Sequence, residues 1–322
     1  MIRVSQHGDG DFSTVSAAID SIPEECEEEV TILILPGIYK EKLTIRKSGL
    51  TLLGTSAATT ILTYGDYGRM EMEDGSRRGT FRTASVFLDA SDLTIKNLTF
   101  ENSAGSGPDI GQALALYVDG DRIRFDHCRI LGGQDTLFTG PLPPSPMIPD
   151  GFIGPKEHAP RVNGRHYYHQ CLIRGDIDFI FGSATAYFDQ CELFSENHVG
   201  EEVKGYVTAA STPEGQPYGY VFSDCRFTGD CPAGTVYLGR PWRNYAKTVL
   251  LRCEIGAHIK TEGWFNWNKP EAEETIFYAE YQSFGLGAST DRASYVRQLT
   301  DAEAADYTKE QVLGDWIKEG KR

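Results

Sequence analysis

Apolar and polar positions alternate along the chain in a pattern that recurs many times. Five segments share the order apolar, two variable positions, Cys, one variable position, apolar; they centre on Cys128, Cys171, Cys191, Cys225 and Cys253. Residues 95–100 repeat the pattern with Leu98 in place of the cysteine, and residues 50–53 indicate one further copy. Because such self-similarity marks stacked structural units, the pattern predicts a β-solenoid with the cysteines packed inside its coils.

The intervals between these copies indicate where the coils are interrupted. Successive cysteines lie 43, 20, 34 and 28 residues apart. The shortest interval corresponds to about one turn of a solenoid, so the longer ones predict a turn plus an insertion. The proline-rich residues 141–160 cannot form a central strand, and we expect them, like residues 196–217, to be a long loop. Such loops often border functional sites.

Strand-forming runs fill the middle of the chain, whereas helical patterns are confined to its ends. Residues 12–22 have the apolar spacing of a helix, and residues 298–316 predict one or two helices packed on the side of the stack. Thr300 and Thr308 are the expected N-caps of these helices, with Glu303 and Gln311 as capping-box partners. We therefore expect a single all-β domain, residues 1–322, with a helical cap at its N-terminal end.

Two aspartates occupy the same position of the repeat. Asp135 and Asp178 each lie seven residues after a repeat cysteine, and no other copy has an acidic residue there. Neighbouring parallel strands are about 4.8 Å apart, so the two carboxylates are expected to stack. Such a pair cannot ionise fully, which allows one carboxyl to act as an acid while the other stays an anion. A calcium site or a salt-bridged structural pair is the alternative.

A later stretch, LGRPWRNYAKTV, places an arginine and a tryptophan two residues apart around a proline. Arg240 can hold a carboxylate through two hydrogen bonds, and Trp242 offers a flat face to a sugar. The GWFNW stretch adds Trp264 and Trp267. Each aromatic residue alone is more often part of a core, but three tryptophans within 26 residues favour a carbohydrate-binding surface.

Charge and composition disfavour several classes of function. A net charge of −15 over 322 residues argues against nucleic-acid or anionic-membrane partners, and no apolar run is long enough to span a bilayer. The sequence has no CxxC pair and no histidines at recognisable ligand spacing, so we expect no metal and no cofactor. The N-terminus lacks the features of a secretory signal, which favours a cytoplasmic protein unless the sequence is a trimmed mature form.

Six short motifs follow one another along the chain: GIYKE, ENSAG, GQALAL, GQDTLF, GDIDFIFG and LGRPW, at residues 37–41, 101–105, 111–116, 133–138, 175–182 and 238–242. They occur in the order found in pectin methylesterases, and the chain resembles this family from about residue 8 to residue 267. The resemblance implies a right-handed parallel β-helix. It also implies hydrolysis of galacturonate C6 methyl esters without a metal.

The same resemblance gives roles to individual residues. Asp178 matches the nucleophile, Asp135 the general acid/base, and Arg240 the arginine that hydrogen-bonds the nucleophile. Gln112 and Gln134 match the glutamines that hold the oxyanion. The positions matching the substrate-binding surface are Trp242, Trp264, Phe181 and Phe138.

Three positions depart from the family pattern, and one of them, Ser103 in place of the usual threonine, is a conservative change. Phe138 stands where the family often has tyrosine, so a sugar contact through a phenol would be lost. Asp176 stands where threonine is common and brings a third carboxylate near the pair. We expect the side chain of Asp176 to point away from the groove.

Three other functions are compatible with the residues. A retaining glycoside hydrolase also carries two carboxyls about 5 Å apart, and a non-catalytic carbohydrate-binding relative or a thioesterase could use the same fold. The paired glutamines favour an esterase. The expected partner is methyl-esterified homogalacturonan or its oligogalacturonides, with no nucleic acid and no membrane, and the protein is expected to be a monomer.

Overall fold

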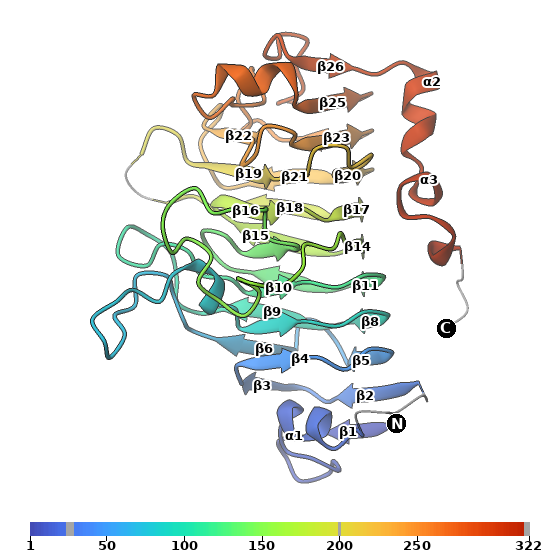
Figure 1. The fold of residues 1–322 in the computed structure, drawn as a ribbon. Helices are drawn as coiled ribbons and strands as arrows, with labels where there is room; N and C mark the ends of the chain where they lie inside the picture. The colour runs from blue at the N-terminus through green and yellow to red at the C-terminus, as the bar shows by residue number, and fades with distance from the viewer. Residues whose placement is uncertain (24–28, 199–200, 319–322) are drawn as a thin grey trace.

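Three long parallel sheets wrap around one axis in the computed structural model, which describes residues 1–23, 29–198 and 201–318 (Figure 1). Sheet A contains β1 (Ile2–Val4), β2 (Val30–Ile34), β5 (Leu50–Gly54), β8 (Leu93–Lys96), β11 (Ile123–Asp126), β14 (Arg165–His169), β17 (Thr185–Asp189), β20 (Tyr220–Ser223), β23 (Lys247–Leu251), β25 (Phe277–Tyr281) and β26 (Val296–Gln298). Sheet B contains β3 (Gly37–Lys40), β6 (Thr60–Tyr64), β9 (Thr99–Asn102), β12 (Arg129–Leu131), β15 (Leu172–Gly175), β18 (Glu192–Ser195), β21 (Arg226–Gly229) and β24 (Glu254–Ile255). Sheet C contains β4 (Leu43–Ile45), β7 (Val86–Leu88), β10 (Leu116–Val118), β13 (Leu137–Thr139), β16 (Ile177–Gly182), β19 (Gly205–Ala210) and β22 (Val236–Gly239).

One coil consists of three consecutive strands, one from each sheet. For example, β11, β12 and β13 form one coil, and β14, β15 and β16 form the next. Each strand of the first coil pairs in parallel with its counterpart in the second. This arrangement is a parallel β-helix, so the solenoid predicted from the repeat is confirmed.

The interior is filled by ladders of equivalent residues. The five repeat cysteines and Leu98 are all buried in one continuous core, and the cysteines that the structure describes are unpaired. Beside them, Phe125, Tyr168, Phe188 and Phe222 form a stack with ring centroids 4.7, 4.6 and 4.5 Å apart. The residues that the repeat places at one position therefore contact one another from coil to coil.

A left-handed residue turns the chain sharply between sheets A and B. The residue before each ladder position has a φ between 49° and 55°; these residues are Asn97, His127, Gln170, Gln190, Asp224 and Arg252. Repetition of this conformation gives these six corners the same geometry. The apolar pattern is therefore in phase on successive coils.

Short helices cover one end and one side of the stack, as predicted. Helix α1 (Val15–Asp20) is capped by Thr14 and buries its apolar face against the first coils. Near the C-terminus, α2 (Asp301–Ala304) has the expected capping box of Thr300 and Glu303, and Thr308 caps α3 (Lys309–Leu313). In Figure 1 these helices lie beside sheet A, where Leu313 packs on its outer face.

No helix in the described ranges is long and apolar enough to cross a membrane. The remaining helical turns are η1 (Thr80–Arg82), η2 (Pro270–Glu274), η3 (Ala305–Tyr307) and η4 (Asp315–Ile317).

The two expected loops differ in structure. Residues 141–160 contain no strand and are held together by the Arg161 guanidinium, which donates to the carbonyls of Lys156, Glu157 and Ala159 at 2.7 Å each. The prediction for residues 196–217 is wrong in part, because β19 within this range is a full strand of sheet C. Its run GYVTAA has few large apolar residues, so it gave a weak strand signal.

The sequence showed no histidines at recognisable ligand spacing, but the fold brings two histidines and an aspartate together. Asp126 and His169 are paired across β11 and β14, and His127 follows Asp126 at the corner. These three side chains meet on the outside of the stack. The interval of 43 residues hid this contact because ligand motifs are usually read over short distances.

The aromatic stack should contribute much of the stability of the central coils. We expect Phe188→Ala to lower the free energy of unfolding by about 3–5 kcal/mol, because it leaves a cavity between Tyr168 and Phe222. Phe284→Ala is the control, since this side chain is exposed, and should change that free energy by less than about 0.5 kcal/mol. Denaturant unfolding measures both, and equal effects would contradict a dominant role for the stack.

Candidate active site

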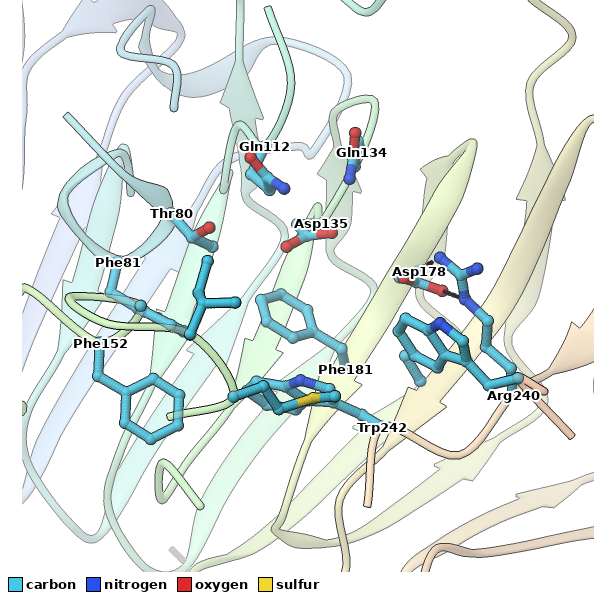
Figure 2. A pocket seen from close by; sticks show the side chains of 15 residues that line it. Thr80, Phe81, Gln112, Gln134, Asp135, Phe152, Asp178, Phe181, Arg240 and Trp242 are labelled. Atoms are coloured by element: carbon cyan, nitrogen blue, oxygen red, sulfur yellow. Dashed lines mark hydrogen bonds and ion pairs between the residues drawn. The ribbon is translucent and has the colours of Figure 1, made fainter. Parts of the chain in front are cut away.

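A cavity of about 360 Å³ lies on the outer face of sheet C (Figure 2). Successive coils and the loop of residues 141–160 form its lining: Thr80, Phe81, Gln112, Gln134, Asp135, Met147, Ile148, Gly151, Phe152, Asp178, Phe181, Ala209, Arg240, Trp242 and Trp267. Of the nine side chains expected in the site, seven are in this set. The β-helix therefore brings these seven residues together although they are up to 130 positions apart, from Gln112 to Trp242.

The two aspartates lie on adjacent coils, as predicted. The pairing of Leu137 with Ile180 and of Phe138 with Phe181 places Asp135 opposite Asp178 by the same register. The backbone N–H of Asp135 donates to the carbonyl of Ile177 at 2.9 Å, which extends the register to the aspartates themselves. The register of the two strands therefore places the Asp135 carboxyl next to the Asp178 carboxyl.

Unusual backbone geometry exposes these aspartates to the cavity. Asp135 and Asp178 both have positive φ values, 62° and 51°. Between Ile177 and Ile180, β16 also contains one residue more than its partner segment in β19, so it carries a β-bulge at Asp178. Bulges and left-handed residues in strands cost free energy and are concentrated at functional sites, where they redirect side chains.

Arg240 holds Asp178 through two hydrogen bonds. Its Nε donates to Oδ1 at 2.8 Å and its Nη2 to Oδ2 at 2.7 Å. The guanidinium carbon lies 3.8 Å from the ring centroid of Tyr206 and 3.8 Å from that of Trp267, so two aromatic faces enclose it. This arrangement fixes the carboxylate plane and keeps a positive charge beside it. It also occupies both oxygens of Asp178, which argues against the calcium alternative.

Burial and charge give the two carboxyls different protonation behaviour. Burial, together with the negative charge of Asp178, raises the pKa of Asp135 well above its usual range. Burial also raises the pKa of Asp178, but the charge and hydrogen bonds of Arg240 oppose that rise. Asp178 is therefore the carboxyl that ionises first, and Asp135 retains a proton beside it.

Two glutamine side chains lie next to Asp135 at the same cavity (Figure 2). Gln134 directly precedes Asp135, and its side chain partly opposes the rise in the pKa of the Asp135 carboxyl. Gln112 lies on the preceding coil, and the N–H of the next residue, Ala113, donates to the Gln134 carbonyl at 3.0 Å. This bond holds the backbone segments that carry the two glutamines side by side. Together they can present N–H donors to an oxygen that becomes negatively charged.

Aromatic rings form the apolar side of the cavity. Phe181 and Trp242 lie 5.7 Å apart between ring centroids, and Phe81 lies 6.5 Å from Trp242 in a stacked orientation. Phe152, from the proline-rich loop, completes the group at 5.7 Å from Phe81 and 6.1 Å from Trp242. A flat apolar surface next to two carboxyls suits a sugar that carries an ester.

Two predictions of substrate-binding residues are wrong. Trp264 is only 1% exposed, pairs with Gly239 as part of the last coil and stacks on Tyr278 at 4.2 Å inside the core. Phe138 is fully buried beneath Phe181 and does not line the cavity. Trp267, three residues after Trp264, lines the cavity instead.

The third carboxylate, Asp176, is not part of the cavity lining, in agreement with the expectation that it points away. Its Oδ1 accepts a hydrogen bond from the N–H of Ile177 at 2.6 Å, and its Oδ2 lies 3.8 Å from Nδ1 of His198. Burial raises its pKa. Its charge still adds a minor contribution to the raised pKa of Asp135.

Several residues of the site were not identified from the sequence. Tyr206, which covers Arg240, lies in the range that we expected to be a loop. Asn102, within the ENSAG motif, is buried and donates to the carbonyls of Asp66 at 2.9 Å and Leu114 at 3.0 Å. It thereby ties together the segments that lead to Phe81 and Gln112. The ENSAG motif was the sequence signal for Asn102, but the motif alone does not indicate which segments this side chain joins.

Fold and site together define a hydrolase with a pair of aspartates on a parallel β-helix, and comparison with known proteins agrees. The family model described as Pectinesterase matches residues 1–141 and 161–315. The chain is 36% identical to Pectinesterase 31 of Arabidopsis thaliana over 95% of this chain and 90% of that protein. It therefore belongs to the pectinesterase family, as the motifs predicted.

Solved structures give the same result. Pectin methylesterase PemA from Erwinia chrysanthemi has a TM-score of 0.80 and 34% identity, covering 98% of this chain and 97% of that one. Pectin methylesterase from carrot has a TM-score of 0.82 and 29% identity, covering 98% and 94%. A pectin methylesterase in complex with a hexasaccharide matches with a TM-score of 0.80 and 34% identity, covering 98% of this chain and 97% of that one. The predicted fold and the predicted class, a carboxylic ester hydrolase, are confirmed at the level of the family.

The two hydrogen bonds from Arg240 to Asp178 should set the acidic side of the pH profile. With Asp178 as an ionised nucleophile and Asp135 as a proton donor, we expect kcat/KM to rise with pH as Asp178 loses its proton and to fall as Asp135 loses its own. Arg240→Lys keeps one charge but loses the two-point hydrogen bond. We expect it to move the acidic limb to higher pH and to lower kcat/KM by on the order of 10²-fold.

Arg243→Lys provides the matched control for this experiment. The Arg243 guanidinium donates to the backbone carbonyls of Trp242 and Ser145 at 2.9 Å each, and not to a carboxylate. Its substitution should leave the acidic limb in place. An unshifted limb in Arg240→Lys, or equal shifts in both variants, would contradict the assignment of this limb to Asp178.

Proposed function

We propose that this protein hydrolyses the C6 methyl esters of galacturonate residues in pectin, with Asp178 as nucleophile. The observation that carries the proposal is the unequal aspartate pair. One carboxylate is held by Arg240, and its neighbour, Asp135, has a pKa raised by burial and by that charge. Both face a cavity with two amide side chains and an aromatic surface. The pectin methylesterases of similar structure support the choice of substrate.

In the first half of the reaction, the Asp178 carboxylate attacks the ester carbonyl. Negative charge develops on the carbonyl oxygen, and the amides of Gln112 and Gln134 stabilise it by hydrogen bonds. As the tetrahedral intermediate collapses, the bond to the methoxy oxygen breaks and Asp135 gives its proton to leaving methanol. Asp178 is then joined to the sugar as an acid anhydride.

In the second half, water cleaves the anhydride. Asp135, now ionised, takes a proton from the water as it attacks the galacturonyl carbonyl. The free galacturonate leaves, Asp178 returns as a carboxylate against Arg240, and Asp135 is protonated again. Each turnover therefore consumes one ester and one water and yields one carboxylate and one methanol.

Replacement of either aspartate tests these roles. We expect Asp178→Asn and Asp135→Asn each to lower the rate of methanol release by about 10³-fold or more, since one removes the nucleophile and the other the proton carrier. Asp176→Asn is the matched control because its carboxyl is buried nearby but does not line the cavity. It should retain activity within about tenfold of wild type.

Circular dichroism and thermal unfolding establish whether the variants remain folded. A folded Asp178→Asn protein with wild-type activity would rule out this mechanism. Methanol and new reducing ends should be measured in the same reaction on methylated pectin. Methanol alone supports the esterase, whereas reducing ends would support the glycoside hydrolase alternative.

The proline-rich loop suggests how the substrate is held. The family match omits residues 142–160, so this segment is particular to the chain relative to the family model. It contributes Met147 and Ile148 to the cavity mouth, and these side chains are 59% and 68% exposed. We propose that the loop contacts the methyl-esterified sugars of short oligogalacturonides as well as those of the polymer.

This contribution to binding can be measured by removing the apolar side chains from the loop. Met147→Ser combined with Ile148→Ser should raise KM for methylated oligogalacturonides several-fold while kcat stays within about twofold, because neither side chain takes part in the proposed chemical steps. Ile38→Ser, at an exposed position of β3 outside the cavity, is the control. An unchanged KM in the double variant would remove the loop from substrate binding.

A further inference from the structure

Three ligand-type side chains converge at the outer corner between sheets A and B, whereas the active-site cavity belongs to sheet C. Asp126 ends β11, His127 follows it, and His169 ends β14 on the next coil. Nδ1 of His127 and Nδ1 of His169 each lie 2.8 Å from Oδ1 of Asp126. Across residues 1–23, 29–198 and 201–318, this is the one group of three such side chains whose ligand atoms lie within 4.8 Å of one another.

The backbone of the β-helix positions this group. Asp126 and His169 face each other in the parallel pairing of β11 and β14, and the N–H of His127 donates to the His169 carbonyl at 3.0 Å. His127 has the left-handed conformation of every corner, with a φ of 52°. The ring of Tyr167 lies parallel to that of His169 at 6.0 Å, and its hydroxyl donates to Asp189 at 2.7 Å. The three ligand atoms are therefore held in place before any ion arrives.

The donor set indicates which ions would fit. Two imidazole nitrogens and one carboxylate oxygen suit Zn²⁺ and the later first-row transition metals, whereas Ca²⁺ and Mg²⁺ require oxygen ligands. Metal–ligand bonds of about 2.0–2.2 Å place neighbouring ligand atoms roughly 3 Å apart, close to the separations found here. We propose that Asp126, His127 and His169 bind one divalent transition-metal ion, with Zn²⁺ as the representative case, and that the ion ties two coils together.

Binding requires a rearrangement of protons at the imidazoles. In the metal-free group each Nδ1–H can donate to the Asp126 carboxylate. Each ring can instead carry its proton on Nε2, which leaves Nδ1 free to coordinate while the ring stays neutral. Lys96 and Asp189 flank the group on the neighbouring strands, so their opposite charges offset each other in its surroundings. The side chain of His127 is more than half exposed, which leaves water access to the remaining coordination positions.

Titration of the untagged protein with ZnCl₂ in a calorimeter tests the proposal. We expect saturable binding of one ion per chain, and the visible absorption spectrum of bound Co²⁺ should show nitrogen and oxygen ligands. His127→Gln and His169→Gln should each weaken binding by at least about tenfold. His158→Gln is the matched control, because His158 is an exposed histidine that pairs only loosely with Glu157, at 3.9 Å. It should bind as wild type does.

Stability and activity provide independent readouts. Zn²⁺ should raise the thermal unfolding midpoint of the wild type by about 2–4 °C, and a chelator should reverse the rise. His127→Gln should lose this shift while releasing methanol at the wild-type rate. Absence of saturable Zn²⁺, Ni²⁺ or Cu²⁺ binding by the wild type would overturn the proposal, and so would binding that neither histidine variant weakens. Both results are independent of whether the protein is an esterase.

Discussion

Register between neighbouring coils is the constraint on which the rest of the structure depends. One offset of 43 residues places Cys128 next to Cys171 in the core and Asp135 next to Asp178 in the cavity. A slip of one residue in this pairing would turn core side chains outward and separate the carboxyls. The buried ladders hold the register strongly because any shift would break contacts in every coil. The core therefore supplies the precision that two separate motifs need to act as one site.

Within that register, Arg240 makes the two aspartates unequal. Stacking alone would give two similar carboxyls that share one proton. The guanidinium binds both oxygens of Asp178 and leaves Asp135 buried beside the resulting charge. Tyr206 and Trp267 enclose the guanidinium, so the aromatic groups of the site also help to set its electrostatics. With Arg240 as the cation bound to Asp178, the aspartate pair can provide both a nucleophile and a proton donor.

The repeat in the sequence predicted which residues lie next to each other on neighbouring coils. It did not predict which side chains of an irregular segment enter the core. Spacing after the cysteines was enough to pair Asp135 with Asp178, but it did not show which tryptophan of GWFNW enters the core. Trp264 is taken into the last coil by its bridge to Gly239, and Trp267 is left at the cavity. The histidine–aspartate group obeys the 43-residue offset and could have been found by applying it to polar residues too.

The proposed mechanism depends most directly on which of the two carboxyls carries the proton. Carbon-13 NMR of labelled aspartate side chains, assigned with Asp135→Asn and Asp178→Asn, follows each carboxyl through a pH titration of the folded protein. The carboxyl of Asp178 should ionise at the lower pH, and Asp135 should stay protonated until well above the usual range of an aspartate. Ionisation of Asp135 before Asp178 would contradict the division of roles on which the proposed mechanism rests.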